Sequence, residues 1–144
     1  MIRPAGVADI PALTVLEQVF PTDRMSGRNF RDLLRRGRAA VLVYEAAGRV
    51  VGAAVVLYRR NARRARIYSL VVDPTQRGRG IARQLLVAVE EDARARHCEA
   101  LQLEVRPDNA PALHLYQQLG YAIVQRVAHF YEDGSSALRL DKAL

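Results

Sequence analysis

Apolar residues are spaced along the chain in two ways, and each spacing predicts a different kind of element. Four segments carry apolar residues at intervals of three and four, which is typical of helices with one buried face. These segments are residues 10–20, 26–37, 80–96 and 109–120. Seven shorter segments are rich in Val, Leu and Tyr or alternate apolar and polar residues, which is typical of strands. They are residues 2–4, 39–45, 50–58, 65–72, 101–105, 121–131 and 135–140.

Turn and cap residues mark the ends of these segments. Asp9 and Ser26 stand where the N-cap or first turn of a helix would begin, and Gly37 and Gly120 follow the last helical positions. The dipeptide Asp133-Gly134 predicts the turn of a final hairpin. The element order is therefore a strand, two helices, three strands, a helix, a strand, a helix and a hairpin.

The three strands in the middle of the chain are separated only by short polar stretches. Strands joined so closely pair antiparallel, because a parallel pair needs a long crossover connection. The chain has 144 residues, 50% of them hydrophobic, which is enough for one continuous core. We therefore predict a single domain over residues 1–144, of the α/β (α+β) class, with a mixed and largely antiparallel sheet.

Several kinds of partner are disfavoured by the sequence. No apolar run approaches the roughly 20 residues of a membrane-spanning helix, and the start lacks the charged-then-apolar order of a secretory signal. We expect a cytoplasmic protein without a membrane partner. The single cysteine, Cys98, can form no internal disulfide and has no evident base that would make it a nucleophile. The histidines show no metal-ligand spacing with it, so we expect no metal.

The charge balance favours an anionic partner. The formal net charge is +7, and Lys142 is the single lysine, so nearly all of the positive charge is arginine. A phosphorylated cofactor and nucleic acid are both compatible with this charge. The Arg59–Arg66 cluster is interpreted as a solvated basic turn rather than a nucleic-acid contact, because no aromatic residues interleave for base stacking. It is also compatible with the steering of an acidic protein substrate.

A glycine-bearing turn between a strand and the longest helix provides the main chemical signal. Residues 67–72 form the strand, and Arg77-Gly78-Arg79-Gly80-Ile81-Ala82 leads into the helix. A helix start exposes unpaired N–H groups, and glycines let a phosphate approach the backbone closely. A purely structural turn remains an alternative. A P-loop is excluded because no Gly-Lys-Ser/Thr follows, and a dinucleotide fold would want the glycines after the first strand of an alternating series.

Two separated motifs resemble the GNAT family of N-acetyltransferases, and within it the RimI-type enzymes that acetylate peptide α-amino groups. The segment 77–82 is similar to the family's Gln/Arg-x-x-Gly-x-Gly/Ala acetyl-CoA motif. The segment 103–121, LEVRPDNAPALHLYQQLGY, is similar to the RimI run Leu-Glu-Val-Arg-x-x-Asn-x-x-Ala-x-x-Leu-Tyr-x-x-x-Gly-Phe. The resemblance implies a GNAT fold, with a mixed, mostly antiparallel seven-stranded sheet flanked by four helices.

The resemblance also implies roles for individual residues. Glu104 would take the proton of the acceptor amine, and Tyr116 would serve as the acid for the departing thiolate. Their alternatives are a charged residue on a half-solvated strand and a core aromatic. The cosubstrate acetyl-CoA would be bound by residues of the strand, the turn and the second motif. These are Leu70, Val71, Val72, Arg77, Gly78, Arg79, Gly80, Ile81, Ala82 and Asn109. Capping of its own helix is an equally good explanation for Asn109.

The expected reaction is direct acetyl transfer to the α-amino group of a protein N-terminus. The resemblance implies an N-terminal alanine of a ribosomal protein, with residues 129–134 near the acceptor, although Ser135-Ser136 departs from the usual acidic pair of RimI proteins. One alternative is the same transfer to a small-molecule amine. An alternative of another class is a ribosome- or RNA-binding module without catalysis, although nucleic acid is disfavoured. Both a monomer and a homodimer are compatible with the sequence.

Overall fold

The computed structural model describes residues 1–144 and contains one seven-stranded sheet with four α-helices. The strands are β1 (Ile2–Pro4), β2 (Ala39–Ala46), β3 (Arg49–Leu57), β4 (Arg64–Val72), β5 (Ala100–Val105), β6 (Ala122–Val127) and β7 (Ala137–Ala143). The helices are α1 (Ile10–Glu17), α2 (Gly27–Arg35), α3 (Ile81–Ala95) and α4 (Ala110–Gln118), with short 3-10 turns at Val7–Asp9 and Pro74–Gln76. This arrangement confirms the predicted fold class and element order.

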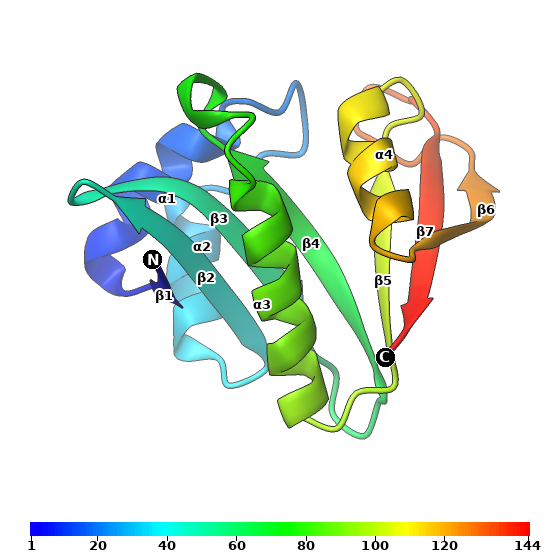
Figure 1. The fold of residues 1–144 in the computed structure, drawn as a ribbon, viewed down its shortest axis with the longest axis horizontal. Helices are drawn as coiled ribbons and strands as arrows, with labels where there is room; N and C mark the ends of the chain where they lie inside the picture. The colour runs from blue at the N-terminus through cyan, green and yellow to red at the C-terminus, as the bar shows by residue number, and fades with distance from the viewer.

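The sheet is antiparallel except at one place. Its strand order is β1-β2-β3-β4-β5-β7-β6, and β2, β3 and β4 form the predicted antiparallel meander. Only β4 and β5 run parallel, because α3 forms the crossover between them. Their pairing covers the first part of each strand, from Arg64 opposite Ala100 to Ile67 opposite Leu103. Beyond this point the two strands diverge, as Figure 1 shows.

Helices cover both faces of the sheet and bury two clusters of apolar side chains. On one face α3 contributes Leu85, Leu86 and Val89, which are fully buried against β2, β3 and β4. On the opposite face α1 and α2 bury Leu13 and Phe30. Figure 1 shows α3 and α4 in front of the sheet and the other two helices behind it. The apolar stripes recognised in the sequence are therefore the buried faces of these helices.

A glycine in β3 allows α3 to pack closely on the sheet. A Cβ atom at Gly52 would lie 3.1 Å from the side chains of both Ile81 and Leu85. Because this separation is shorter than ordinary van der Waals contact, a larger residue here would push α3 outward. The start of α3 is thereby held against the middle of the sheet.

The predicted helix starts are confirmed for Ser26 and only partly for Asp9. The Ser26 hydroxyl accepts a hydrogen bond from the Asn29 amide at 3.2 Å. Asp9 occupies the N-cap position of α1, but its carboxylate points back to the Arg3 guanidinium at 2.8 and 2.9 Å and to the Gly6 amide at 2.7 Å. The charged partner on β1 outcompetes the helix amides. The helix α1 also ends at Glu17, earlier than the predicted residue 20.

The final hairpin differs most from the sequence prediction. Strand β6 ends at Val127, and β7 begins at Ala137 and continues to Ala143, so the predicted boundaries 121–131 and 135–140 are wrong. Residues 128–136 form a loop, because His129 has a positive φ of 54° and the amides of Phe130 and Tyr131 donate to Ser135 rather than to a neighbouring strand. Asp133-Gly134 lies within this loop instead of forming a tight hairpin turn.

A buried ionic cluster attaches β7 to α3. Glu90 is 5% exposed and accepts hydrogen bonds from the Lys142 ammonium at 3.0 and 3.1 Å and from the Tyr121 hydroxyl at 2.8 Å. The Glu90 carboxylate is therefore fully hydrogen-bonded in an apolar environment.

None of the helices is long and apolar enough to cross a membrane.

Candidate active site

Where β4 diverges from β5, the facing edges of the two strands are no longer hydrogen-bonded to each other. A bulge in the β3–β4 pair leaves Tyr68 without a partner, because Val55 lies opposite Ser69 and Val56 opposite Ile67. Bulges bend the strand that carries the extra residue, which accounts for the direction in which β4 leaves β5. The split between the two strands therefore begins just after Ile67.

Main-chain N–H and C=O groups on both sides of the split have no neighbouring strand with which to form hydrogen bonds. The Asp73 amide donates to Val51 on β3, so by strand alternation the amides of Leu70 and Val72 point away from β3, toward the split, and that of Val71 points toward β3. On β5, Glu104 is half-buried as a residue although its side chain is only 4% exposed, so its accessible area belongs mainly to the main chain. Extended groups of a ligand could bond to both edges.

At the end of β4 the predicted anion-binding turn has an unusual run of free donors. No backbone amide from Arg77 to Arg83 donates a hydrogen bond within the chain; the first that does is Gln84, to Gly80 at 3.1 Å. Gly78 and Gly80 have φ of 80° and 75°, a left-handed conformation that L side chains rarely adopt. This conformation and the helix start turn several N–H groups outward, which is the arrangement that binds phosphate groups.

The two arginines of this turn are free to contact the same anion. Arg77 and Arg79 are exposed, and neither makes an ion pair. Arg83, near the start of α3, donates to the Gln118 side chain at the end of α4 at 3.3 Å. This contact links the two helices, and Ile81 and Ala82 belong to the first turn of α3.

Glu104 lies at the apex of the split and is held by two arginines. Its Oε1 accepts from Arg66 Nε at 2.9 Å and lies 2.8 Å from Arg66 Nη2, and its Oε2 accepts from Arg139 Nε at 2.8 Å. A carboxylate offers about four lone-pair directions, and three are directed at guanidinium nitrogens. One direction therefore remains for an amine or a water molecule.

Tyr116 is buried, but its hydroxyl has no partner in the chain. The residue is 7% exposed and its ring packs edge-on against Tyr121 with the centroids 5.8 Å apart. Burial, together with the nearby Tyr131, raises the pKa of the Tyr116 hydroxyl. No fully buried side-chain oxygen lacks a hydrogen bond, so this unpartnered hydroxyl must keep some solvent-accessible area. It is available to donate to a ligand.

Asn109 has the structural role that the sequence left open. It is the N-cap of α4, and its side-chain oxygen accepts from the Ala112 amide at 3.3 Å. Its side-chain nitrogen makes no hydrogen bond with the protein. Capping by the oxygen leaves the amide nitrogen available as a donor.

Two loops meet over the open side of Glu104. Residues 18–26, between α1 and α2, contact the 128–136 loop through the Asp23 carboxylate, which accepts from the Glu132 amide at 3.1 Å. Arg106 bridges the same loops, because it donates to the Thr22 hydroxyl at 2.7 Å and to Asp133 at 3.1 Å. The Arg106 guanidinium also lies 4.1 Å from the centroid of the Tyr131 ring. These contacts enclose the approach to the apex of the split.

Sequence reasoning missed three residues that shape this site. Arg66 falls within the predicted strand 65–72, as β4 confirms, but it was grouped with the basic turn and its contact with Glu104 was not predicted; Arg139 on β7 was not considered. Glu17, at the end of α1, is 3% exposed and accepts from the Met25 amide at 2.8 Å and the Ser69 hydroxyl at 3.0 Å. Burial raises the pKa of Glu17. It attaches the 18–26 loop to β4 beside the bulge.

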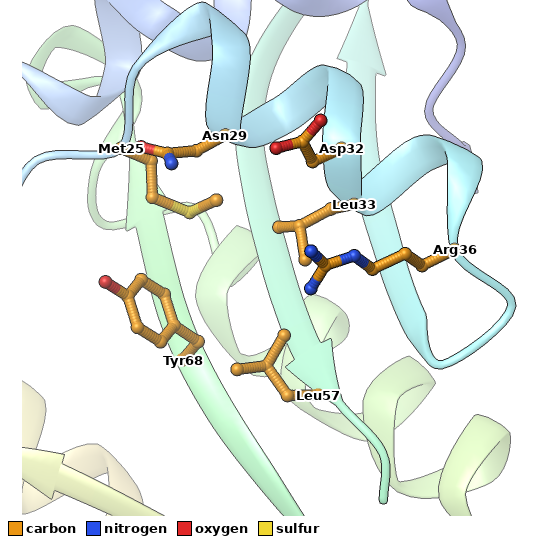
Figure 2. Close-up of a pocket in the computed structure, with 7 residues that line it drawn as sticks. All are labelled: Met25, Asn29, Asp32, Leu33, Arg36, Leu57 and Tyr68. Carbon is orange, nitrogen blue, oxygen red and sulfur yellow. The ribbon is translucent and has the colours of Figure 1, made fainter.

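Other candidate features include neither Glu104 nor Tyr116. A hollow of about 220 Å³ lies between α2 and strands β3 and β4. In Figure 2 the Tyr68 ring lies across this hollow from Met25 and Asn29. Cys98 is half-buried and burial raises the pKa of its thiol, the opposite of what a nucleophilic cysteine requires. No three His, Cys, Asp or Glu residues are grouped so that they could hold a metal ion.

Three of the five arginines in the Arg59–Arg66 cluster are paired with acids. Arg63 pairs with Glu99 and Arg64 with Asp141, both at 2.7 Å, and Arg66 pairs with Glu104. An extended basic face for nucleic acid needs arginines that are free to meet phosphates. Arg59 and Arg60 make no ion pair, and the expectation that nucleic acid is disfavoured stays a prediction.

Comparison with known proteins identifies the family. The model of the acetyltransferase (GNAT) family matches residues 10–121. Streptothricin acetyltransferase of Streptomyces lavendulae is 35% identical over 135 residues, covering 91% of this chain and 70% of that protein. N-alpha-acetyltransferase 30 of Saccharomyces cerevisiae is 34% identical over 82 residues, which are 56% of this chain and 47% of that protein.

Solved structures agree over the whole chain. Ard1 from Thermoplasma volcanium superimposes with a TM-score of 0.91 at 29% identity, covering 100% of this chain and 97% of that one. The ribosomal-protein-S18-alanine N-acetyltransferase of Escherichia coli gives a TM-score of 0.87 at 25% identity, covering 99% and 92%. The chain therefore belongs to the GNAT family of acetyltransferases and is an N-acetyltransferase.

Proposed function

We propose that this enzyme transfers the acetyl group of acetyl-CoA to the α-amino group of a protein N-terminus. One observation carries the proposal: the free amides of residues 77–83 lie at one end of the split, and Glu104 lies at its apex beneath two joined loops. The whole-chain likeness to Ard1 and to the S18-alanine enzyme supports the choice of acceptor.

The residues present fit acetyl-CoA. The amides of the 77–83 turn, with the side chains of Arg77 and Arg79, would bind its pyrophosphate. The open edge of β4 at Leu70 and Val72 would bond the amides of its pantetheine arm, and Asn109 would add a side-chain donor. Two solved structures of the same fold, the NatC complex and a Thermoplasma acidophilum PaiA acetyltransferase, contain CoA or coenzyme A.

Glu104 would accept the proton of the acceptor amine through water. One lone-pair direction of its carboxylate is free, and this direction would hold a water molecule against the amine. An α-amino group with a pKa near 8 is about 10% neutral at pH 7, whereas a lysine with a pKa near 10.4 is about 0.04% neutral. The α-amine therefore needs far less help from the base.

Tyr116 would stabilise the departing thiolate chiefly by hydrogen bonding. Giving up its proton outright to a thiolate whose conjugate pKa is about 8.5 would run uphill by roughly 2 kcal/mol even for an ordinary phenol. Burial raises the pKa of Tyr116 further above that of an ordinary phenol, which makes full transfer less favourable. A hydroxyl donor pre-aimed at the developing charge still lowers the barrier.

Transfer to a small-molecule amine is the second candidate, favoured by one observation. The streptothricin acetyltransferase relative is 35% identical over 91% of this chain. The two loops over Glu104 narrow the approach to the apex, which suits a slender peptide end; a bulky polyamine would have to separate them.

The experiment that tests the proposal measures thiol release from acetyl-CoA with three sets of acceptors. These are peptides with free N-termini, the same peptides with blocked N-termini, and small amines that include streptothricin. We expect turnover only with free N-termini, and mass spectrometry should place the acetyl group on the α-nitrogen. Equal rates with blocked peptides, or exclusive use of small amines, would overturn the proposal.

A further inference from the structure

Two arginines at the apex of the split share a single carboxylate. Arg66 and Arg139 each form a single ion pair, and both pairs are with Glu104. Two guanidinium groups therefore face one carboxylate. The other acid–base pair nearby, Arg106 with Asp133, is neutral by itself. Asp23 and Glu132, on the covering loops, form no ion pair with either arginine, although both carboxylates lie close enough to Tyr68, the ring beside Arg66, to help raise the pKa of its hydroxyl.

Both arginines keep unused donors that remain within reach of a ligand. Arg66 directs Nε and Nη2 at Glu104, and its Nη1 makes no hydrogen bond. Arg139 directs Nε at Glu104 and Nη1 at Gln125 at 3.1 Å, which leaves its Nη2 free. The side chains are 41% and 27% exposed, whereas Glu104 is 4% exposed. Both arginine side chains are therefore more accessible than the carboxylate that they bind.

Aromatic rings fix the position of Arg66. Its guanidinium carbon lies 5.6 Å from the centroid of the Tyr68 ring and 5.8 Å from that of Phe130. Tyr68 belongs to the bulge of β4, and Phe130 belongs to the 128–136 loop. A guanidinium held between two rings and a carboxylate loses little side-chain freedom when it binds a further anion.

We propose that Arg66 and Arg139 select acceptors that carry a carboxylate close to the reacting amine, namely protein N-termini with Asp or Glu at the first or second residue. This inference rests on the proposed function. The amine must approach the free lone-pair direction of Glu104, and the unused nitrogens of both arginines adjoin that carboxylate. An acidic side chain within a residue of the amine can therefore bridge to them, in a charge-assisted contact.

The test compares kcat/KM for matched free-N-terminal peptides that differ at one position. Asp and Glu at the first or second residue are compared with Asn, Gln and Lys at the same places. We expect a preference of about tenfold for the acidic peptides, carried mainly by KM, that weakens as salt is raised. Arg66→Gln and Arg139→Gln should each reduce it below about threefold. Arg66→Lys, which keeps the charge, should retain part of it.

Arg64→Gln provides the matched control. Arg64 lies on the same strand two residues from Arg66 and pairs with Asp141, away from Glu104. We expect this variant to keep the full acidic preference. If it loses the preference as Arg66→Gln does, general surface charge is responsible and the inference is wrong.

Other outcomes separate this inference from the function on which it rests. Peptide turnover without an acidic preference in the wild type, or a preference that survives in both glutamine variants, overturns the inference and leaves N-terminal acetylation intact. If Arg66→Gln does not fold, Arg139→Gln and Arg66→Lys decide. If no peptide is acetylated while a small amine is, the proposed function fails, and this inference fails with it.

Discussion

Two neighbouring tyrosines offer a test that separates catalysis from stability. Tyr116 and Tyr121 pack edge-on with ring centroids 5.8 Å apart, and both are buried. The Tyr121 hydroxyl donates to Glu90 at 2.8 Å, whereas the Tyr116 hydroxyl has no partner within the chain. Removing each hydroxyl by substitution with Phe should therefore have opposite consequences.

The expected magnitudes follow from these contacts. Tyr116→Phe breaks no hydrogen bond in the folded enzyme, so the free energy of unfolding should change by less than about 0.5 kcal/mol. Loss of a hydroxyl donor to the developing thiolate removes about 1.5–3 kcal/mol of transition-state stabilisation, which lowers kcat about 10- to 150-fold. Tyr121→Phe withdraws a donor from a buried carboxylate, which should cost about 1–3 kcal/mol of stability, with kcat nearly unchanged.

Urea unfolding and thiol-release kinetics at saturating acetyl-CoA measure both quantities on the same preparations. In a thermal scan of the same preparations, the melting temperature of Tyr121→Phe should fall by roughly 3 °C for each kcal/mol lost, and that of Tyr116→Phe should stay near the wild-type value. The reasoning is refuted if Tyr116→Phe keeps the wild-type kcat, or if it destabilises the protein as much as Tyr121→Phe does.

Three further predictions concern other parts of the site. Burial raises the pKa of Glu17, so the folded state binds its proton more tightly than the unfolded state and loses stability as pH rises above the ordinary glutamate range. Urea titrations should therefore show Glu17→Gln gaining on the wild type between pH 5 and pH 8; a constant difference would contradict this. Gly78→Ala should raise the KM for acetyl-CoA about tenfold or more through backbone strain at the phosphate turn, whereas Gly134→Ala, with a similar φ of 84° in the 128–136 loop, should not. Glu104→Gln should lower kcat at least about 100-fold and also reduce thermal stability by leaving two arginines uncompensated; a fully active variant would exclude Glu104 as the base.

The local features of the fold were predictable because short-range physics decides them. The Ser26 cap, the meander and the helix after Gly80 each depend on neighbouring residues, and each was found as expected. The turn from Arg77 to Ala82 could be recognised because its glycines and its place after a strand have a direct backbone consequence. Such signals need no knowledge of distant contacts.

The pairing of Arg66 and Arg139 with Glu104 could not be predicted because it depends on long-range strand order. Glu104 lies directly opposite Arg139 only because β7 inserts between β5 and β6, whereas chain order alone would place β6 beside β5. Arg66 reaches the same carboxylate through the single parallel pair of the sheet. The limits of the 128–136 loop were missed for a similar reason, since Arg106 and Asp23 fix it from distant segments.

The ion pair between Lys142 and Glu90 has a consequence for an enzyme that modifies amines. Lys142 is the only lysine in the chain, its side chain is 21% exposed, and its ammonium is bound to Glu90. The remaining positive charge is arginine, whose guanidinium stays protonated and does not accept acetyl groups under these conditions. The protein thus displays no freely exposed lysine amine that could compete with its acceptor for the acetyl group.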